Sequence, residues 1–504
     1  MGAEPEPGVP VRPAAAVVLV PFPAQGHVSP ILLMARALAA RGVDATVAVP
    51  DFVHRRIVVS ASQDGADDHG VELASIPSGV PDDGDGDPPG FAGFAHSMEH
   101  DMPARLEEML TRRALTGRGV ACLIVDVLAS WAVPVAERCG VPAVGFWPAM
   151  LATYRAVAAI PELIAKGLIS NCGIPISTKQ LAIHGAEVNG HHLIGDSLNT
   201  LPSELELSTS ELPWLVGDEA CQRSRFTLWR KIMTRAKILH PILVNSFPGE
   251  DIGELQQPHD RRILQVGPLP TNGIFDHTTN KDSSLHESPR LKNPSMWKSD
   301  ETCMDWLDRQ KAGSVIYVSF GSWVASIGRD AIYELALGLE ATGLPFLWTL
   351  KDEQSWRGGL PDRYAEAVSG RGKIVPWSPQ EDVLKHKAVG CYLTHCGWNS
   401  TMEAIQHGVR LLCYPVSGDQ FINCAYIVKM WGIGIRLSST KGSVVQDCVK
   451  RIMEGEDGRR LQEKVDELRE RVMMGGGRRT AKMNLECFVD RILRRDDHAL
   501  GKLS

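Results

Sequence analysis

The sequence has no apolar run of about 18 residues, which is the length that a membrane-spanning helix needs. Its start, residues 1–13, is rich in Pro and Glu, and the apolar run that follows (residues 14–20) is too short for the core of a secretory signal. The eleven cysteines are an odd number and include no CxxC pair. We therefore expect a cytosolic protein with buried, reduced thiols.

Several nucleotide and hydrolase motifs are also missing. No G-x-G-x-x-G follows a strand, and neither G-x-x-x-x-G-K-[ST] nor G-x-S-x-G occurs. These absences argue against a dinucleotide fingerprint, a P-loop and the nucleophile elbow of a hydrolase. The formal net charge is −7 with both signs mixed along the chain, so no nucleic-acid surface is indicated.

Short apolar runs alternate with helical patterns in each half of the 504 residues. Buried strands separated by helices predict a parallel, doubly wound sheet, and the length suits two lobes. We predict an α/β protein with two Rossmann-like lobes that face a central cleft. The expected boundaries are an N-terminal lobe at 1–260, a linker at 261–300, a C-terminal lobe at 301–483, and a last helix at 484–504 that packs back on the first lobe.

Two helix starts can be placed from their capping residues. Ser29 is expected at an N-cap with Pro30 in the first helical position, so that the helix runs to Arg41. The stretch Ser378-Pro-Gln-Glu381 has the form of a capping box, which places a second helix start directly after Trp377.

A strand at 391–394, a turn at His395-Cys-Gly397 and a helix from Trp398 have the arrangement that binds a diphosphate. Backbone N–H groups and the positive end of the helix point at the anion, and Gly397 allows close approach. His395, Asn399 and Ser400 add side-chain donors, while Glu403 lies one turn further and can accept from a ribose diol. Taken singly, Asn399 or Ser400 reads as an ordinary N-cap and Glu403 as a solvated charge.

The flanks of this segment add candidates. The Trp377 indole suits stacking on a base, although a core position is slightly favoured for it. Asp419 and Gln420 follow the strand at 411–414, on the edge where α/β folds place ligands.

Residues 377–420 resemble the plant secondary-product glycosyltransferase box of the family 1 UDP-sugar transferases. They keep W-x-P-Q, H-x-A-V-G, T-H-C-G-W-N-S-T-x-E, G-V and D-Q at the family's spacing, with Arg410 where the family usually has Pro. The resemblance implies a GT-B fold, inverting chemistry, no metal cofactor, and a UDP-sugar donor. It implies that Trp377 stacks on uracil, that Gln380 and Glu403 bind ribose, that His395, Asn399, Ser400 and Ser322 contact the phosphates, and that Trp398, Asp419 and Gln420 contact the sugar. A closing Gln indicates glucose.

Transfer of a sugar to an alcohol needs a base near the acceptor oxygen. His27 follows the first strand in a loop before the expected helix, and Asp126 ends the strand at 122–126. A buried carboxylate needs a partner, and a bond to His27 would orient the imidazole. By itself a loop histidine is more often a structural hydrogen-bonder. The family resemblance extends to both residues, so we predict His27 as general base and Asp126 as its orienting partner.

An acceptor wall is expected from first-lobe aromatic and aliphatic residues, although core packing explains most of them equally well: Phe22, Phe94, Phe146, Trp147 and Leu151. The family's acceptors are flavonoids, phenylpropanoids, terpenoids or hormones. Two other functions stay open: a UDP-sugar epimerase or hydrolase on the same fold, and a non-catalytic UDP-sugar-binding protein. A monomer is the default expectation.

Overall fold

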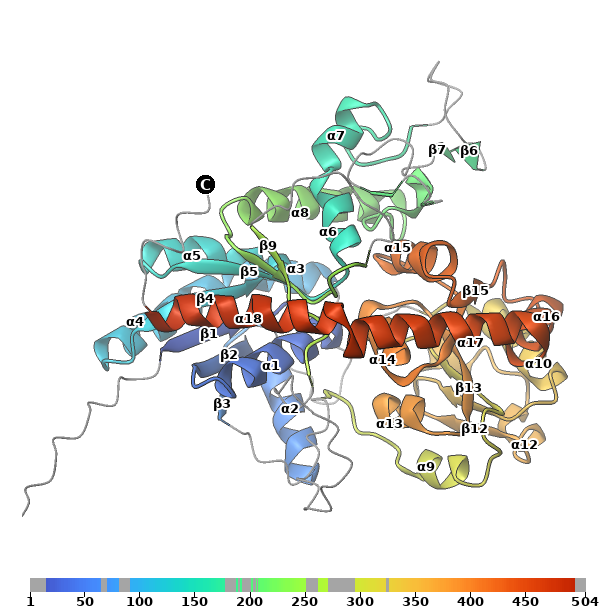
Figure 1. Cartoon of the computed structure of the whole chain (residues 1–504). Coiled ribbons are helices and arrows are strands. Elements are labelled where there is room, and N and C mark those ends of the chain that lie inside the picture. The colour runs from blue at the N-terminus through green and yellow to red at the C-terminus, as the bar shows by residue number, and fades with distance from the viewer. Residues whose placement is uncertain are drawn as a thin grey trace, which may run out of the picture.

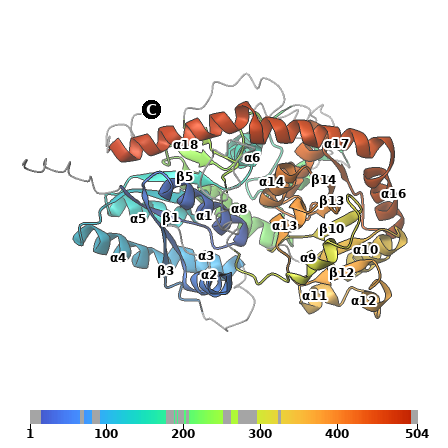
Figure 2. The ribbon, with the colours of Figure 1, turned by 60° about the horizontal axis from the view of Figure 1, so that its bottom comes forward.

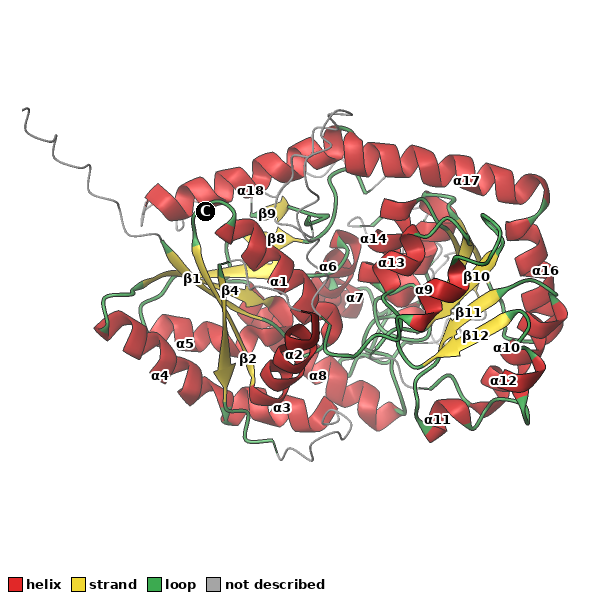
Figure 3. Cartoon of the chain, turned by 90° about the horizontal axis from the view of Figure 1, so that it is seen from below, coloured by secondary structure: helices red, strands yellow, loops and turns green. Residues whose placement is uncertain are grey.

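The computed structural model describes residues 15–64, 70–80, 91–176, 187–188, 191–192, 201–202, 205, 207–250, 262–270, 295–322 and 326–494. Two lobes lie side by side, each built on one sheet that is covered by helices (Figures 1 and 3). Most of the predicted linker (261–300) and the end of the chain after 494 lie outside the described residues.

The N-terminal lobe contains a seven-stranded sheet in the order β3-β2-β1-β4-β5-β8-β9. All its strand pairs are parallel. The strands are β1 (Ala16–Val20), β2 (Asp44–Pro50), β3 (Val71–Ile76), β4 (Val120–Asp126), β5 (Ala143–Trp147), β8 (Ile242–Val244) and β9 (Ile263–Gln265). Every residue of β1 is buried, as expected for a central strand that is covered on both faces.

The C-terminal lobe contains a six-stranded parallel sheet in the order β12-β11-β10-β13-β14-β15. Its strands are β10 (Val315–Ser319), β11 (Phe346–Thr349), β12 (Gly372–Val375), β13 (Val389–Thr394), β14 (Arg410–Cys413) and β15 (Gly434–Arg436). The predicted α/β class with two Rossmann-like lobes is confirmed. A separate two-stranded pair joins β6 (Glu187–Val188) to β7 (His191–His192).

Helices connect the strands in both lobes. In the first lobe they are α1 (Gln25–Ala39), α2 (Asp51–Asp64), α3 (Phe91–His100), α4 (Met102–Leu115), η1 (Val127–Ala132), α5 (Val133–Arg138), α6 (Leu151–Ala158), α7 (Ile160–Ala165), η3 (Thr209–Glu211) and α8 (Glu219–Ala236). In the second they are α9 (Thr302–Leu307), α10 (Arg329–Ala341), α11 (Gln354–Arg357), α12 (Tyr364–Ala367), α13 (Gln380–Lys385), α14 (Trp398–His407), α15 (Gln420–Ala425), η4 (Tyr426–Met430), α16 (Gly442–Met453), α17 (Gly455–Arg469) and η5 (Glu470–Met474). None of the helices in the described ranges is long and apolar enough to span a bilayer.

The last helix, α18 (Gly476–Arg494), continues the line of α17 and runs back over the first lobe (Figures 1 and 2). Asn484 Nδ2 donates to the Gln265 carbonyl of β9 at 2.8 Å. Leu485 and Phe488 are fully buried. The final element thus attaches the C-terminal part of the chain to the edge of the first sheet.

The predicted start of α1 is wrong, and α13 begins close to its predicted start but without the predicted capping box. α1 begins at Gln25, so His27 lies in its first turn and Pro30 lies inside the helix. The Ser29 hydroxyl accepts from Gln25 Nε2 and does not cap the helix. α13 begins at Gln380 with Pro379 at its N-cap and no capping side chain. Ser378 Oγ instead bonds the hydroxyl groups of Tyr317 and Thr349.

Candidate active site

His27 and Asp126 lie together at the carboxyl ends of β1 and β4. His27 Nδ1 and Asp126 Oδ2 are 2.7 Å apart. Asp126 is completely buried, whereas the His27 side chain is 22% exposed. Because an imidazole next to a carboxylate donates its Nδ1 proton to it, Nε2 carries the free lone pair. The arrangement gives a proton acceptor on one side of the ring and a buried anion on the other.

Two backbone groups hold the Asp126 carboxylate in place. The N–H of Phe22 donates to Oδ2 at 3.2 Å, and the N–H of Leu128 donates to Oδ1 at 2.9 Å. With His27, the buried carboxylate therefore has three donors, which offsets its loss of hydration. Asp126 is fixed by both flanking loops and presents Oδ2 to the imidazole.

The helix that carries His27 also meets the second lobe. Pro30 has no N–H, so the carbonyl of Gly26, four residues earlier, loses its usual helical donor. Asn399 Nδ2, at the start of α14, donates to that carbonyl at 3.0 Å. A hydrogen bond between lobes thus replaces the one that proline removes, directly beside His27.

The His395 ring is confined at the start of α14. A methyl group on Gly321, after β10, would lie 2.7 Å from its Cε1 and Nε2, and one on Gly397 would lie 2.9 Å from its Cε1. Burial lowers the pKa of His395 to about 4, so the ring is neutral at pH 7. Its Nδ1 is buried and has no hydrogen-bond partner in the described part of the chain. Ser322 lies on the same loop as Gly321.

Gln380 forms hydrogen bonds with two other predicted residues. Its Nε2 donates to Ser400 Oγ at 2.9 Å and to Glu403 Oε2 at 2.7 Å. Its Oε1 accepts from the hydroxyl groups of Tyr317 and Tyr392, at 3.2 and 3.0 Å. Burial raises the pKa of Glu403 to about 7, against the opposing effect of the Gln380 hydrogen bond. One amide therefore fixes the carboxylate of α14 relative to two buried tyrosines.

Asp419 and Gln420 form the other side of this site. Asp419 Oδ2 accepts from Asn423 Nδ2 at 2.8 Å. Burial raises the pKa of Asp419, and the hydrogen bond from Asn423 opposes this effect. Gln420 Oε1 accepts from the N–H groups of Val416 and Ser417, both at 2.9 Å, and so closes its own loop.

The two tryptophans of the segment differ in their surroundings. The partly exposed Trp377 ring lies 5.7 Å from the ring of Trp297, on the chain that enters the second lobe. Trp398 is buried, stacks on Phe247 of the first lobe with centroids 6.3 Å apart, and donates from Nε1 to the Asn245 carbonyl at 2.7 Å. The Trp398 indole therefore joins the two lobes.

The five predicted acceptor residues, Phe22, Phe94, Phe146, Trp147 and Leu151, are all buried. Only the Phe22 ring has a described contact with the His27 ring, with centroids 5.1 Å apart. Phe146 pairs in register with Asp126 in the sheet, and Trp147 donates from Nε1 to the Met150 carbonyl. Phe22 is therefore the candidate nearest to the base, while the role of the others stays a prediction.

Sequence reasoning missed three features of this site: Tyr317 and Tyr392 behind Gln380, Trp297 against Trp377, and the Gly26 carbonyl as an acceptor for Asn399. The last had a signal, since Pro30 within a helix leaves the carbonyl four residues earlier without a donor. From the sequence, Tyr317 and Tyr392 are recognisable only as residues of buried strands. Nothing in the pattern of a buried strand shows which of its side chains faces a neighbouring helix.

Comparison with known proteins identifies two sequence families. The profile described as UDP-glucoronosyl and UDP-glucosyl transferase matches residues 298–459, and the profile of an N-terminal glycosyltransferase domain matches residues 14–142. The chain is 40% identical over 486 residues to UDP-glycosyltransferase 82A1 of Arabidopsis thaliana, which covers 93% of this chain and 96% of that protein. It is 31% identical over 480 residues to the DIMBOA UDP-glucosyltransferase BX8 of Zea mays, covering 90% and 93%.

Solved structures with the same fold support this relationship. The crystal structure of Os79 from O. sativa in complex with UDP superimposes with a TM-score of 0.73 at 25% identity, covering 94% of this chain and 100% of that one. A second structure of Os79 contains U2F and trichothecene, with a TM-score of 0.72 at 26% identity and the same coverage. The two-lobed architecture is therefore that of the GT-B transferases.

Proposed function

Because the chain belongs to the plant family 1 UDP-glycosyltransferases, which move a sugar from a UDP-sugar to a small acceptor, we propose that it transfers glucose from UDP-glucose. The acceptor would be a hydroxyl, or a carboxyl, of a small lipophilic molecule such as a flavonoid, phenylpropanoid, terpenoid or hormone. Support for glucose comes from the closing Gln420 and from the maize relative, whose name states a glucosyltransferase.

The observation that carries this proposal is the hydrogen bond of His27 to the buried Asp126, on a helix that contacts the start of α14 through Asn399. In the proposed step, His27 Nε2 takes the proton of the acceptor hydroxyl. The acceptor oxygen then forms a bond to the anomeric carbon on the face opposite the diphosphate, while the bond from that carbon to the diphosphate oxygen breaks. UDP leaves with the bonding pair, and an α-linked donor gives a β-glucoside. Asp126 stabilises the imidazolium that forms.

The donor contacts are proposed from the second lobe. UDP would stack its base on Trp377 and place its ribose diol on Gln380 and Glu403. The diphosphate would bind at the start of α14, with Ser322, Gly397, Asn399 and Ser400 as neighbours and the neutral His395 ring as a donor. Free N–H groups at a helix start stabilise such an anion without a metal ion. Asp419, Gln420 and the Trp398 backbone would contact the sugar.

The experiment incubates the protein with a pool of phenolic acceptors and, separately, UDP-glucose, UDP-galactose or UDP-glucuronic acid. We expect acceptor-dependent UDP release and β-glucosides by mass spectrometry and NMR, with the highest kcat/KM for UDP-glucose. Faster turnover with another donor would reject glucose, and α-glucosides would reject inversion. Donor hydrolysis that no acceptor accelerates would favour a hydrolase. A cytosolic location and a monomeric state stay predictions.

A further inference from the structure

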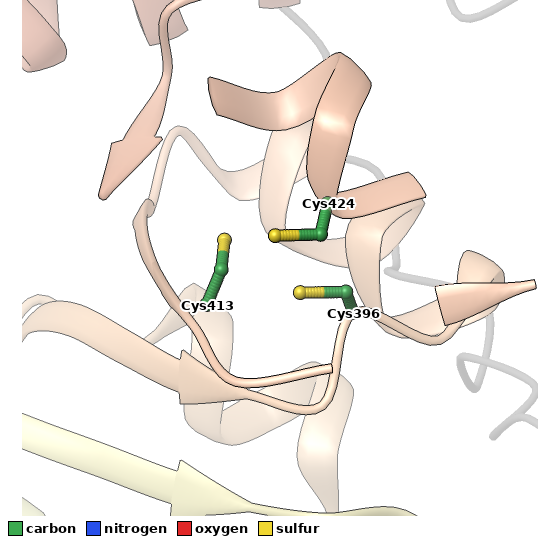
Figure 4. Close-up of side chains that lie close together, drawn as sticks. All are labelled: Cys396, Cys413 and Cys424. Carbon is green, nitrogen blue, oxygen red and sulfur yellow. The ribbon is translucent and has the colours of Figure 1, made fainter. Parts of the chain in front are cut away.

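Three cysteines of the second lobe lie together at the turn His395-Cys396-Gly397, which is called the donor turn because the diphosphate is proposed to bind there. Cys396 belongs to the turn after β13, Cys413 ends β14, and Cys424 lies in α15. All three are completely buried, and their sulfur atoms lie within 4.8 Å of one another. Figure 4 shows the three side chains converging from separate elements on one space.

We propose that Cys396, Cys413 and Cys424 form a site for a soft, thiophilic metal cation, and that Cu(I) is the cation it fits. An ion at about 2.3 Å from each of three thiolates holds their sulfur atoms about 4 Å apart. All three sulfur atoms already lie within 4.8 Å of one another, so each pair is at most about 1 Å further apart than such an ion requires. Three separate elements supply the sulfurs, so their convergence does not result from local sequence spacing.

The number of ligands favours Cu(I) over zinc. In the described ranges, no further His, Cys, Asp or Glu joins this group. Thiolates bind soft cations, among them Cu(I) and zinc, but structural zinc is almost always bound by four ligands and this cluster offers three. Solvent does not reach the three sulfur atoms, since all three cysteines are completely buried. A three-thiolate, water-excluding site suits a cation that accepts three sulfur ligands.

One cation lies beside the cluster. Arg436 of β15 is the register partner of Cys413 in the sheet. Its guanidinium is held by Glu211 at 2.7 Å and lies over the Phe421 ring. A positive charge near thiols favours the thiolate forms that bind a metal.

The proposed site is separate from the transfer chemistry and does not depend on the proposed function. Cys396 nevertheless sits between His395 and Gly397, with φ of 66°, a left-handed conformation that is rare for a residue with a Cβ. The backbone of the donor turn is therefore also the backbone that presents one sulfur ligand.

The test uses the full-length chain in which the exposed Cys172, Cys221 and Cys487 are replaced by Ser, so that surface thiols do not compete. Cu(I) is supplied anaerobically as its bicinchoninate complex, and its transfer to the protein is followed by the loss of the complex's absorbance. The same titration is made with Cys413→Ser/Cys424→Ser, and with Cys391→Ser/Cys448→Ser, which removes two buried thiols outside the cluster.

We expect the parent and the Cys391→Ser/Cys448→Ser control to take one Cu(I) per chain from the bicinchoninate complex. The Cys413→Ser/Cys424→Ser variant should take none. X-ray absorption at the copper edge should show coordination by three sulfur atoms. No uptake by the parent would overturn the proposal, as would equal uptake by the Cys413→Ser/Cys424→Ser variant with native circular dichroism. If that variant does not fold, the X-ray absorption spectrum of copper bound to the parent protein decides. Copper that is coordinated by nitrogen, by oxygen or by only two sulfur atoms would then contradict the site.

Discussion

Among single residues, Asp126 shows how one buried side chain can serve both fold and chemistry. Its carboxylate accepts from two backbone N–H groups and from His27, so it ties the loops after β1 and β4 to the imidazole. An amide of the same shape carries no charge to stabilise an imidazolium, and its NH2 group cannot accept from the N–H donors that one carboxylate oxygen now binds. Asp126→Asn therefore keeps the shape of the side chain but removes its charge and one acceptor.

We predict that Asp126→Asn lowers kcat by about 100- to 10,000-fold, the usual size of general-base assistance, and leaves UDP affinity unchanged. Steady-state kinetics and calorimetric UDP titration measure the two quantities. Asp308→Asn is the matched control, because Asp308 contacts His386 at the surface, at 3.2 Å, in a similar His–Asp pair. Equal kcat values for Asp126→Asn and Asp308→Asn would contradict the assigned role.

Glu403 predicts a pH dependence of donor binding. Burial raises the pKa of Glu403 to about 7, so the group is protonated below this pH and ionised above it. The carboxylate accepts two hydrogen bonds from a ribose diol, whereas the acid accepts less well. UDP affinity should therefore rise as pH increases through about 7, and Glu403→Gln should remove this rise. Calorimetric titration of UDP at several pH values measures this dependence. An equally steep rise of UDP affinity with pH in Glu403→Gln would disprove the prediction.

The position of Gly321 predicts that a side chain there would displace the His395 ring in the donor turn. In Gly321→Ala the added methyl meets the His395 ring at 2.7 Å, and φ of +74° adds backbone strain. Gly343→Ala has the same kind of strain, with φ of +68°, but its methyl meets nothing within 4 Å. We expect both to lose about 1 kcal/mol or more of stability, and only Gly321→Ala to weaken UDP binding in calorimetry. Equal UDP affinities in the two variants would show that the ring position is unimportant.

At the scale of secondary-structure elements, the sequence predicted the strands better than the helix starts. The strands β4 and β13 end at the predicted residues, Asp126 and Thr394, because a short run of apolar residues that must be buried on both faces leaves little freedom. The start of α1 was missed because Pro30 normally marks a first turn, and here a side chain of the other lobe supplies the donor for the Gly26 carbonyl. Such compensation cannot be read from local sequence.

Arg410 illustrates the same limit. It stands where the family pattern usually has Pro. The guanidinium donates to the carbonyls of Gly390, Ile452 and Gly458, at the start of β14. Arg410 therefore joins β13 to α16 and α17, a role that only the tertiary structure reveals.

Helix α18 gives a prediction at this scale. Phe488 is fully buried where this helix crosses the first lobe, whereas Met483 on the same helix is 55% exposed. Phe488→Ala should lower the free energy of unfolding by about 3–5 kcal/mol through lost burial and a cavity. Met483→Ala, the matched control, should change it by less than about 0.5 kcal/mol. Chemical denaturation measures both, and similar small losses would show that α18 contributes little to the fold.

For the whole molecule, the two lobes share one continuous hydrophobic cluster that extends from Val17 to Trp398 and Val465. Polar contacts cross the same boundary, among them Trp431 Nε1 to the Glu250 carbonyl at 2.9 Å and Asn399 to Gly26. The sequence predicted two lobes and placed candidate residues on each. It did not show that α14 and α1 touch, because contacts between distant segments depend on how the lobes pack.

The most direct measurement compares His27→Ala with the wild-type chain in UDP affinity and in acceptor-dependent turnover of UDP-glucose. Donor capture is assigned to the second lobe and proton removal to His27 of the first. The account therefore predicts UDP affinity within about threefold of wild type, with turnover lower by about 100-fold or more. Turnover that survives in His27→Ala would contradict the claim that the two lobes supply separate halves of one active site.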